Sequence, residues 1–400
     1  MSIGGFFLKE KFIKKIKYSK ILFKLLNFFG NLFFGVIKYL VPINNKRVLL
    51  VSYGGRRFDD SPKAILDNLI NDSRFKNYEF VIAIKEYDSI EKNTLIYNNL
   101  KNIRIVKIDT FIYFYMVMSS RIWITNSAIE RSFTFIKKKK NIYVNTWHGT
   151  PIKKMGTDII KSNESFNPVK KFNCDIFLSQ GKYETEIFSR VYRIDKSKIH
   201  QIGLPRNDEL INNASKDSID IKEYFKIKPT KKVILYAPTF REFNIKFGAK
   251  TSNHLNWITQ LDDGYVVLMR AHYETMDIFE NNKNTNIIDV STYDYINDLI
   301  KVSDLLITDY SSIMFDYSIT EKPIILYCYD YDTYERKRGL YFDPRKELVY
   351  ADSSSSLLFH IENNWQDAKI KTINFRYNYI TETGQATQKL VDLLYSTINK

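Results

Sequence analysis

The sequence predicts an α/β protein with two halves, each built on a parallel β-sheet, that follow a basic amphipathic segment. From Lys46 onward, short apolar runs alternate with stretches of helical periodicity, which is the pattern of parallel strands joined by crossover helices. A chain of 400 residues is long for one compact domain and suits two. The first 46 residues differ from the rest, because they carry nine lysines and a single acid, Glu10.

The strands of both halves are predicted from apolar runs of four or five residues. In the first half we expect them at residues 48–52, 80–84, 103–106, 122–125, 142–145 and 176–179, and in the second half at 233–237, 266–269, 287–290, 305–308 and 324–327. Ligands bind at the carboxyl ends of such strands, so a cleft is predicted where the halves meet, near residues 203–230. The expected boundaries are 1–42 for the basic segment, 43–205 and 206–375 for the two domains, and 376–400 for a helix that packs back across them.

The amino-terminal segment is predicted to form a helix that lies in the plane of an anionic membrane surface. Lysine dominates residues 9–20, and residues 21–41 are apolar and aromatic except at Lys24, Asn27, Asn31 and Lys38. These four positions are three, four and seven residues apart, so a helix places them on one narrow stripe and leaves a wide apolar face. Such a helix suits the boundary between lipid phosphates and acyl chains. Pro42 would end it.

Two other interpretations of this segment stay open. A helix of about twenty residues is long enough to span a bilayer, although the two lysines inside the apolar stretch count against it. An ordinary core helix is the second alternative. A cleaved signal peptide is disfavoured, because no small-residue cleavage site follows the apolar run.

The net charge of +15 indicates an anionic partner, which could be nucleic acid, a membrane surface or a phosphate-rich substrate. More than half of this charge lies in the first 46 residues rather than in an aromatic-studded groove, so no nucleic-acid partner is expected. Cys174 and Cys328 are far apart in the sequence and adjoin strand-like runs, which favours free, buried thiols in a reducing compartment. The five histidines are scattered, and no metal-binding pattern is visible.

The first motif is Trp147-His148-Gly149-Thr150-Pro151, directly after the strand expected at residues 142–145. Functional residues concentrate at strand ends in this architecture. Gly149 tolerates positive φ and lets a ligand approach the backbone. A lone histidine is more often structural than catalytic, but one held between Trp and Gly-Thr-Pro at a strand end favours a functional role. Lys153 and Lys154 follow closely.

Two more motifs follow strands of the second half. Arg270-Ala271-His272 comes after the strand expected at 266–269, where an arginine can offer planar donors to phosphate. A surface arginine and histidine on a loop is the alternative. Residues 308–312, Thr-Asp-Tyr-Ser-Ser, run into a helix that begins near Ile313. Hydroxyls and free N–H groups at a helix start can bind an anion, and a simple N-cap explains them equally well.

Weaker signals come from two turns and an acidic pair. Residues 203–208 and 237–241 are turns by their glycine or proline content, and each carries an arginine, Arg206 or Arg241, that could bind phosphate. Asp330 and Asp332 imitate a metal-binding pair of acids. We interpret that pair as surface residues, because it lies outside the other motifs.

In this order the motifs resemble the CDP-glycerol glycerophosphotransferase family of teichoic-acid synthesis. The resemblance covers roughly residues 46–375, and it is carried by residues 147–154, 203–208, 237–241, 270–272 and 308–316. It implies a GT-B-like fold, in which two Rossmann-type domains, the first for the acceptor and the second for CDP-glycerol, follow a membrane-associating segment. The active site would lie between the domains.

The resemblance also implies the site residues. His148 and His272 match the two essential histidines of the family. The positions that match CDP-glycerol-binding positions, or belong to the motifs that carry them, are Trp147, Gly149, Thr150, Pro151, Arg206, Pro238, Thr239, Arg270, Ala271, Ser311, Ser312 and Asp316. We expect His148 to act as general base, and His272 with Arg270 to stabilise phosphate charge. No metal or other cofactor is expected.

The implied reaction moves glycerol phosphate from CDP-glycerol to an undecaprenyl-diphosphate-linked saccharide acceptor and releases CMP, in wall teichoic acid biosynthesis. The short amino-terminal region favours the priming enzyme. A teichoic acid or capsule polymerase of glycerol phosphate or ribitol phosphate is the first alternative, and a GT-B glycosyltransferase that uses a UDP-sugar is the second. We expect a peripheral protein on the cytoplasmic face of the cell membrane, and self-association is left open.

Overall fold

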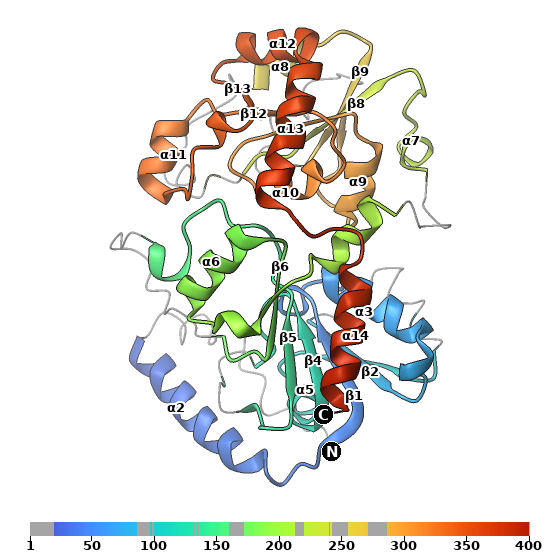
Figure 1. The fold of residues 1–400 in the computed structure, drawn as a ribbon, viewed down its shortest axis with the longest axis vertical. Coiled ribbons are helices and arrows are strands. Elements are labelled where there is room, and N and C mark those ends of the chain that lie inside the picture. Colours follow the sequence, from blue (N-terminus) through green and yellow to red (C-terminus); the bar gives the residue numbers. More distant parts are fainter. Residues whose placement is uncertain are drawn as a thin grey trace, which may run out of the picture. The chain divides into compact units, whose positions relative to one another are not determined.

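The computed structural model describes residues 20–85, 97, 100–130, 133, 136–159, 172–212, 220–239, 241, 255–270 and 286–399 (Figure 1). The chain divides into two compact units. Unit 1 comprises residues 1–58 and 69–146, and unit 2 comprises residues 59–68 and 147–400. The domain boundaries and the cleft expected from the sequence stay predictions.

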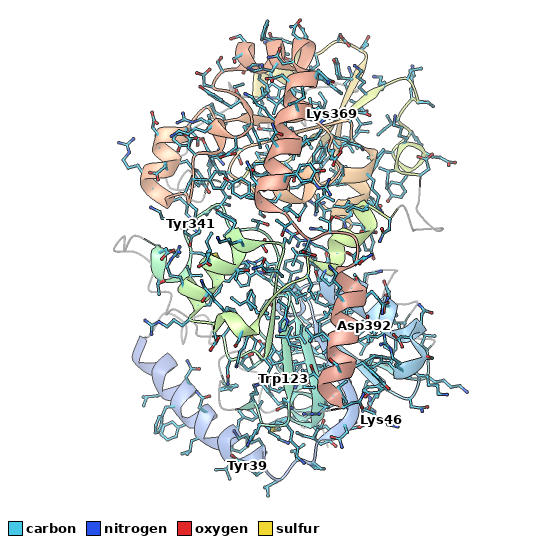
Figure 2. All side chains as sticks on the ribbon, in the orientation of Figure 1. Tyr39, Lys46, Trp123, Tyr341, Lys369 and Asp392 are labelled. Atoms are coloured by element: carbon cyan, nitrogen blue, oxygen red, sulfur yellow. The ribbon has the colours of Figure 1, made fainter. Side chains whose placement is uncertain are left out.

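Unit 1 contains five parallel strands in the order β3-β2-β1-β4-β5. Their bounds are β1 Asn44–Val51, β2 Glu79–Ile84, β3 Ile103–Lys107, β4 Ser120–Thr125 and β5 Ile142–Asn145. The apolar runs of the inner strands are buried on both faces, as parallel sheets require. Trp123, labelled in Figure 2, is fully buried, and its Nε1 donates to the carbonyl of Val117, 2.9 Å away.

The other elements of unit 1 are short except for one long helix. They are α2 (Lys20–Ile37), α5 (Phe111–Ser119) and the 3₁₀ turns η1 (Tyr53–Gly55) and η2 (Ser73–Phe75); α3 (Asp60–Asn71) has its first part in unit 2 and its last residues in unit 1. Thr110 begins α5 as its N-cap, because its hydroxyl accepts a hydrogen bond from the backbone N–H of Tyr113.

Helix α2 ends at Ile37, five residues before the proline that was expected to end it. Its wide apolar side is exposed, with Phe28 and Phe29 63% and 62% accessible. Three of the four positions in the predicted polar stripe, Asn27, Asn31 and Lys38, face unit 1 instead. Asn27 and Asn31 are half-buried, and Nζ of Lys38 donates to the carbonyl of Lys137. Within the described residues, no helix has both the length and the apolar character needed to cross a membrane.

Unit 2 contains the parallel pair β6 (Ile176–Ser179) and β7 (Ile199–Gln201) and a six-stranded parallel sheet. The strand order in that sheet is β10-β9-β8-β11-β12-β13. The bounds are β8 Lys232–Tyr236, β9 Tyr265–Met269, β10 Ile287–Asp289, β11 Leu305–Thr308, β12 Ile324–Tyr327 and β13 Val349–Ala351.

The core of unit 2 lies on both faces of this sheet. Val233 and Leu235 of β8 pack in one hydrophobic cluster, and the alternating residues Ile234 and Tyr236 pack in another. Successive side chains of a strand point to opposite faces of the sheet, and both faces are covered here. Residues 233–236 are therefore apolar at every position. The helices of unit 2, besides the start of α3, are α6 Lys182–Tyr192, α7 Ile221–Tyr224, α8 Asn256–Thr259, α9 Ile296–Val302, α10 Ile313–Ser318, α11 Tyr331–Arg338, α12 Ser354–Asn363, α13 Trp365–Tyr379 and α14 Ala386–Ile398, with 3₁₀ turns η4 Gly156–Asp158, η5 Lys196–Lys198, η6 Pro205–Leu210 and η9 Pro344–Lys346.

The predicted fold class is confirmed. Each expected strand is present within two residues of its predicted bounds, except that β1 begins at Asn44, four residues early. Strands β7 and β13, of three residues each, were not predicted. Cys174 and Cys328 are buried thiols that form no disulfide, as expected.

Candidate active site

The motif at residues 147–151 is anchored by its tryptophan. Trp147 has a left-handed backbone with φ of 54°, and its indole packs among Phe172, Phe177, Phe188 and Tyr192. The imidazole of His148 stacks on this indole, with ring centroids 4.2 Å apart and ring planes at 29°. A half-buried histidine beside a fixed indole has restricted rotamers, so its ring is oriented before any substrate arrives.

Thr150 is bound to a buried carboxylate. Its hydroxyl donates to Oε1 of Glu184 over 2.5 Å, and the backbone N–H of Gln180 donates to Oε2 of the same carboxylate over 2.6 Å. Glu184 lies in the first turn of α6 and is 1% exposed. Burial raises the pKa of the Glu184 carboxyl, and the hydrogen bonds from Thr150 and Gln180 oppose that rise. These bonds tie the motif to the beginning of α6.

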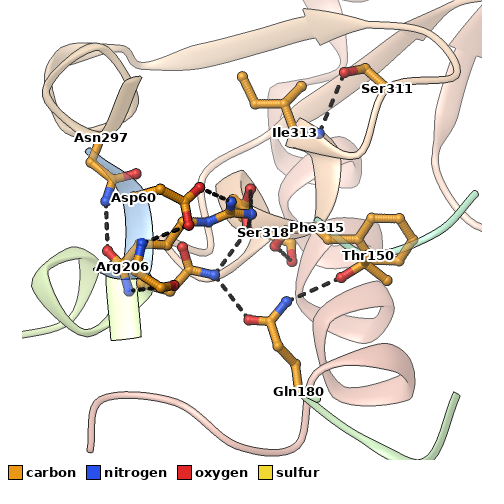
Figure 3. A network of polar contacts seen from close by, with 12 residues as sticks. Asp60, Thr150, Gln180, Arg206, Asn297, Ser311, Ile313, Phe315 and Ser318 are labelled. Carbon is orange, nitrogen blue, oxygen red and sulfur yellow. Dashed lines mark hydrogen bonds and ion pairs between the residues drawn. The ribbon is translucent and has the colours of Figure 1, made fainter. Parts of the chain in front are cut away.

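A chain of buried amides continues from Thr150 to α10 (Figure 3). Nε2 of Gln180 donates to the Thr150 hydroxyl over 3.1 Å, and Oε1 of Gln180 accepts from Nδ2 of Asn207 over 2.9 Å. The same Asn207 nitrogen lies 2.8 Å from Oδ1 of Asp316. Since each member is fixed by its neighbours, the network holds four separate segments of the chain in fixed positions relative to one another.

Arg206 lies in the same network, between two carboxylates. Its Nη1 is 2.5 Å from Oδ2 of Asp60, the first residue of α3, and its Nη2 is 2.8 Å from Oδ2 of Asp316 in α10. The side chains of Arg206, Asp60 and Asp316 are 8%, 4% and 11% exposed. Asn297 closes the group by donating to the backbone carbonyl of Arg206 over 2.7 Å.

Gly149 brings the motif at 147–151 against the motif at 308–316. Its φ is 153°, and a Cβ at this position would lie 2.8 Å from Oγ of Ser312 and 3.9 Å from Nη2 of Arg206. Only glycine fits such a close approach. Three sequence motifs therefore converge at one point of unit 2.

The serines at the start of α10 are not a simple N-cap. Ser312 occupies the N-cap position but makes no capping hydrogen bond with its side chain, and the Ser311 hydroxyl only accepts a 3.5 Å contact from the N–H of Ile313. Both side chains are half-buried. Helix α10 has six residues, so its dipole alone is too small to define an anion site.

Thr239 follows β8 and is held by Asp309, which follows β11. The backbone N–H of Thr239 donates to Oδ1 of Asp309 over 2.8 Å. The Thr239 hydroxyl is buried and has no hydrogen-bond partner among the described residues. A buried hydroxyl without a hydrogen-bond partner destabilises the folded state unless a ligand supplies the missing hydrogen bond. Pro238, which precedes it, is half-buried.

Arg241 and Asp330 correct two sequence interpretations. Nη2 of Arg241 is 2.8 Å from Asp309, and Nε is 2.7 Å from Asp330. The guanidinium also lies over the rings of Tyr310, Tyr329 and Tyr334. Arg241 is 8% exposed, so it is a buried ion-pair partner rather than an open phosphate ligand. Asp330 is likewise a paired, partly buried residue and not the surface acid that we expected.

The structure describes one of the three residues of the predicted motif Arg270-Ala271-His272. Nη1 of Arg270 donates to the backbone carbonyls of Tyr293 and Val290, over 2.6 and 3.2 Å. These contacts place its guanidinium just beyond β9. Ala271 and His272 lie outside the described residues. Among the residues that the structure describes, no group of three His, Cys, Asp or Glu side chains could hold a metal ion.

Sequence reasoning missed the buried partners of these motifs. Asp60, Gln180 and Glu184 supply carboxylate or amide groups to the network around Arg206 and Thr150, and none of them stood inside a quoted motif. Asp309, which holds Thr239 and Arg241, did stand inside one. A charged residue inside an amphipathic helix, such as Glu184, carries no local signal that it will be buried. For Asp60, the sequence does offer one local signal: Asp60, Ser61 and Pro62 together are typical of the start of a helix.

Two units with parallel sheets, and motifs gathered at strand ends, define a GT-B-like transferase fold. A family model described as CDP-glycerol:poly(glycerophosphate) glycerophosphotransferase matches residues 33–396, and the chain belongs to this family. The family description names the donor as CDP-glycerol.

Curated relatives are teichoic acid enzymes. The teichoic acid poly(glycerol phosphate) polymerase of Staphylococcus epidermidis is 31% identical over 385 residues, which cover 90% of this chain and 52% of the relative. The teichoic acid glycerol-phosphate transferase of Staphylococcus aureus is 29% identical over 388 residues, which cover 90% of this chain and 95% of the relative. The chain thus spans about half the length of the first relative and nearly all of the second.

The fold also matches a solved relative. A variant of the wall teichoic acid polymerase TagF, soaked with CDPG, has a TM-score of 0.79 and 27% sequence identity. The match covers 97% of this chain and 98% of that one.

Proposed function

We propose that this protein transfers glycerol phosphate from CDP-glycerol to an undecaprenyl-diphosphate-linked saccharide acceptor in wall teichoic acid biosynthesis. The observation that carries this proposal is the family match over residues 33–396 together with the convergence of three family motifs around Gly149. The names of the relatives from two staphylococcal species support the pathway.

In the proposed reaction, an acceptor hydroxyl attacks the phosphorus that carries glycerol. A new phosphorus–oxygen bond forms to the acceptor, and the anhydride bond to CMP breaks. His148 takes the proton of the attacking hydroxyl, because a neutral imidazole is a suitable base near pH 7. Its stacking on Trp147 orients the ring for this step. Negative charge on the departing CMP would be stabilised by Arg270, and by His272 outside the described residues.

The donor-binding residues divide into two groups by their contacts. We assign Ser311, Ser312 and Thr239 to direct binding, because their hydroxyls make few contacts or none with other described residues. Gly149 leaves room for the phosphates. Arg206 and Asp316 are already paired with buried partners, which favours a positioning role within the donor site. Thr150 shares that role, through Glu184.

We further propose that the protein attaches to the cytoplasmic face of the membrane as a peripheral protein. The support is the exposed apolar side of α2 and the nine lysines of residues 1–46. Such a surface matches an acceptor that is anchored in the same membrane. Self-association stays open.

The decisive experiment gives the purified full chain CDP-glycerol and a synthetic lipid-linked disaccharide. CMP release and a product one glycerol phosphate longer would support the priming reaction. A ladder of longer products would favour the polymerase alternative. A parallel reaction with CDP-ribitol tests the ribitol alternative, and turnover of a UDP-sugar in place of CDP-glycerol would overturn the proposal.

A further inference from the structure

We propose that α5 is a second lipid-docking element, so that unit 1 binds an anionic bilayer through α2 and α5 together. This inference rests on the peripheral attachment proposed above and assigns it a surface that the amino-terminal sequence does not contain. The surface in question consists of the exposed side chains of α5, which are Phe111, Ile112 and Tyr115, and of the lysine run at residues 137–140.

The first turn of α5 presents large apolar side chains to solvent. Phe111, Ile112 and Tyr115 are 81%, 60% and 45% exposed. Positions i, i+1 and i+4 share one side of a helix, so the three side chains form one surface. The opposite side of α5 is buried in unit 1 through Tyr113 and Met116. A short helix with one buried side and one exposed apolar side has the character of an interfacial element.

Helix α5 packs directly against α2. Phe114, which is flanked by the exposed residues of α5, packs against Phe34 of α2 with ring centroids 4.8 Å apart. Phe133 contacts both rings, with centroids 4.9 Å from Phe34 and 5.7 Å from Phe114. The aromatic contact fixes the two helices against each other. The exposed apolar residues of α2 are Leu25, Phe28, Phe29, Leu32, Phe33 and Val36.

Four consecutive lysines adjoin the carboxyl-terminal end of α2. Nζ of Lys38 donates to the carbonyl of Lys137 over 3.2 Å, and Nζ of Lys138 donates to the carbonyl of Val41. These bonds hold residues 137–140 against the turn that follows α2. Lys139 and Lys140 are exposed.

The lysine run decides between a lipid surface and a protein partner. Tyr39, labelled in Figure 2, and Leu40 are 79% and 78% exposed beside the lysines. Aromatic and aliphatic side chains next to lysines complement acyl chains next to phosphate headgroups. Lysines are depleted at the buried centre of protein interfaces. The occupant that this surface fits is therefore an anionic lipid bilayer rather than a second copy of the chain.

The test measures binding of the full chain to vesicles of phosphatidylcholine with and without phosphatidylglycerol. One variant carries Phe111→Ser, Ile112→Ser and Tyr115→Ser. The matched control carries Phe359→Ser, Ile370→Ser and Tyr377→Ser, which are 56%, 49% and 65% exposed in unit 2. A third variant carries Phe28→Ser, Phe29→Ser and Phe33→Ser in α2.

We expect the α5 variant to bind anionic vesicles at least tenfold more weakly and the control to bind like the parent protein. Replacing Lys139 and Lys140 with Gln should weaken binding about fivefold per lysine at low salt, and less at high salt. Direct insertion is read from Phe111→Trp, whose added fluorescence should be quenched by brominated lipids, whereas that of Phe359→Trp should not.

Three outcomes would overturn the inference. If the α5 variant binds normally while the α2 variant is released, α5 does not dock and peripheral attachment through α2 stands. If neither variant loses binding, peripheral attachment through unit 1 fails as well. If the parent protein is a dimer without lipid and the α5 variant is a monomer, the surface is an interface between copies. CMP release with a water-soluble acceptor, measured on each variant, reports transferase activity separately from docking.

Discussion

The guanidinium of Arg206 is held between two carboxylates, with Nη1 2.5 Å from Oδ2 of Asp60 and Nη2 2.8 Å from Oδ2 of Asp316. One arginine thereby joins the start of α3, the turn η6 and helix α10. A buried arginine with two carboxylate partners is oriented by both, and its removal leaves two acids without compensation. This arrangement makes the turn at residues 205–210 a structural centre of unit 2.

Replacing Arg206 should therefore be costly. We expect Arg206→Ala to lower the free energy of unfolding by about 3–5 kcal/mol, because two buried carboxylates lose their partner. Arg206→Lys should cost less, since an ammonium group keeps the charge but cannot bridge both acids. Denaturant unfolding of the whole protein measures both. The control is Arg190→Ala, whose half-exposed pair with Asp158 should contribute only about 0–1 kcal/mol.

The proposed base gives a kinetic prediction. His148→Ala should lower the rate of CMP release at saturating CDP-glycerol about a hundredfold or more, with donor binding largely kept. His200→Ala and His360→Ala are matched controls that should retain nearly the parent rate. A His148 variant with normal turnover would remove the base assignment.

The donor hydroxyls predict a change in KM. Thr239→Val keeps the shape of the side chain and removes its buried hydroxyl, so the KM for CDP-glycerol should rise about tenfold with the loss of one hydrogen bond to a charged group. Ser311→Ala with Ser312→Ala should act in the same direction. Thr259→Val, on the exposed end of α8, serves as the control. An unchanged KM in both donor-site variants would contradict direct binding.

Removal of metal ions tests whether protein side chains alone stabilise the negative charge of the donor phosphates. We expect a chelator to leave the rate of CMP release nearly unchanged, because arginine, histidine and hydroxyl groups are assigned to the phosphates. The rate is measured with and without EDTA, followed by added magnesium. Inactivation by EDTA that magnesium reverses would show that the assignment is incomplete.

Glu184 predicts a pH dependence of stability. Burial raises the pKa of this carboxyl in the folded state, so above the ordinary glutamate pKa of about 4.3 the folded state binds the proton more tightly than the unfolded chain. The free energy of unfolding must then fall as pH rises from that value through the raised pKa. Glu184→Gln removes this slope, because glutamine does not titrate. Denaturant unfolding at several pH values measures the difference.

The control for this prediction is Glu186→Gln on the same helix. A hydrogen bond from Lys196 lowers the pKa of the exposed Glu186 carboxyl, so its stabilising contribution is present above the unfolded pKa and is lost as pH falls. The two variants should therefore change the pH profile in opposite directions and in different pH ranges. Parallel profiles would contradict the assignment.

The sheets could be predicted because their strands are continuous apolar runs buried on both faces. Ile142–Asn145 and Leu305–Thr308 match the prediction residue for residue. Strand β13 was missed because its middle residue, Tyr350, is exposed and its apolar run is not continuous with burial on both faces. For α2, periodicity separated a polar stripe from an apolar face, but it could not say which side unit 1 would cover.

The candidate site was predictable only in part, for a related physical reason. Local sequence revealed Trp147, Gly149 and Ser312, since turns and strand ends have recognisable composition. The burial of Glu184, the clamp on Arg206 and the pairing of Arg241 with Asp330 depend on partners between 34 and 146 residues away. Such pairings are properties of the folded chain, and no local pattern encodes them.

The carboxylate of Asp208 accepts hydrogen bonds from two backbone N–H groups at the start of α14. Ala386 donates to Oδ1 over 2.9 Å and Thr387 donates to Oδ2 over 2.7 Å. These partners follow it by 178 and 179 residues. At a synthesis rate of about 5–20 residues per second, the turn that carries Arg206 emerges from the ribosome roughly 10–40 s before the helix that closes it. During that interval the turn that carries Arg206 lacks its hydrogen bonds to α14. This turn of unit 2 can therefore reach its final hydrogen bonding only after the last helix that the structure describes has been translated.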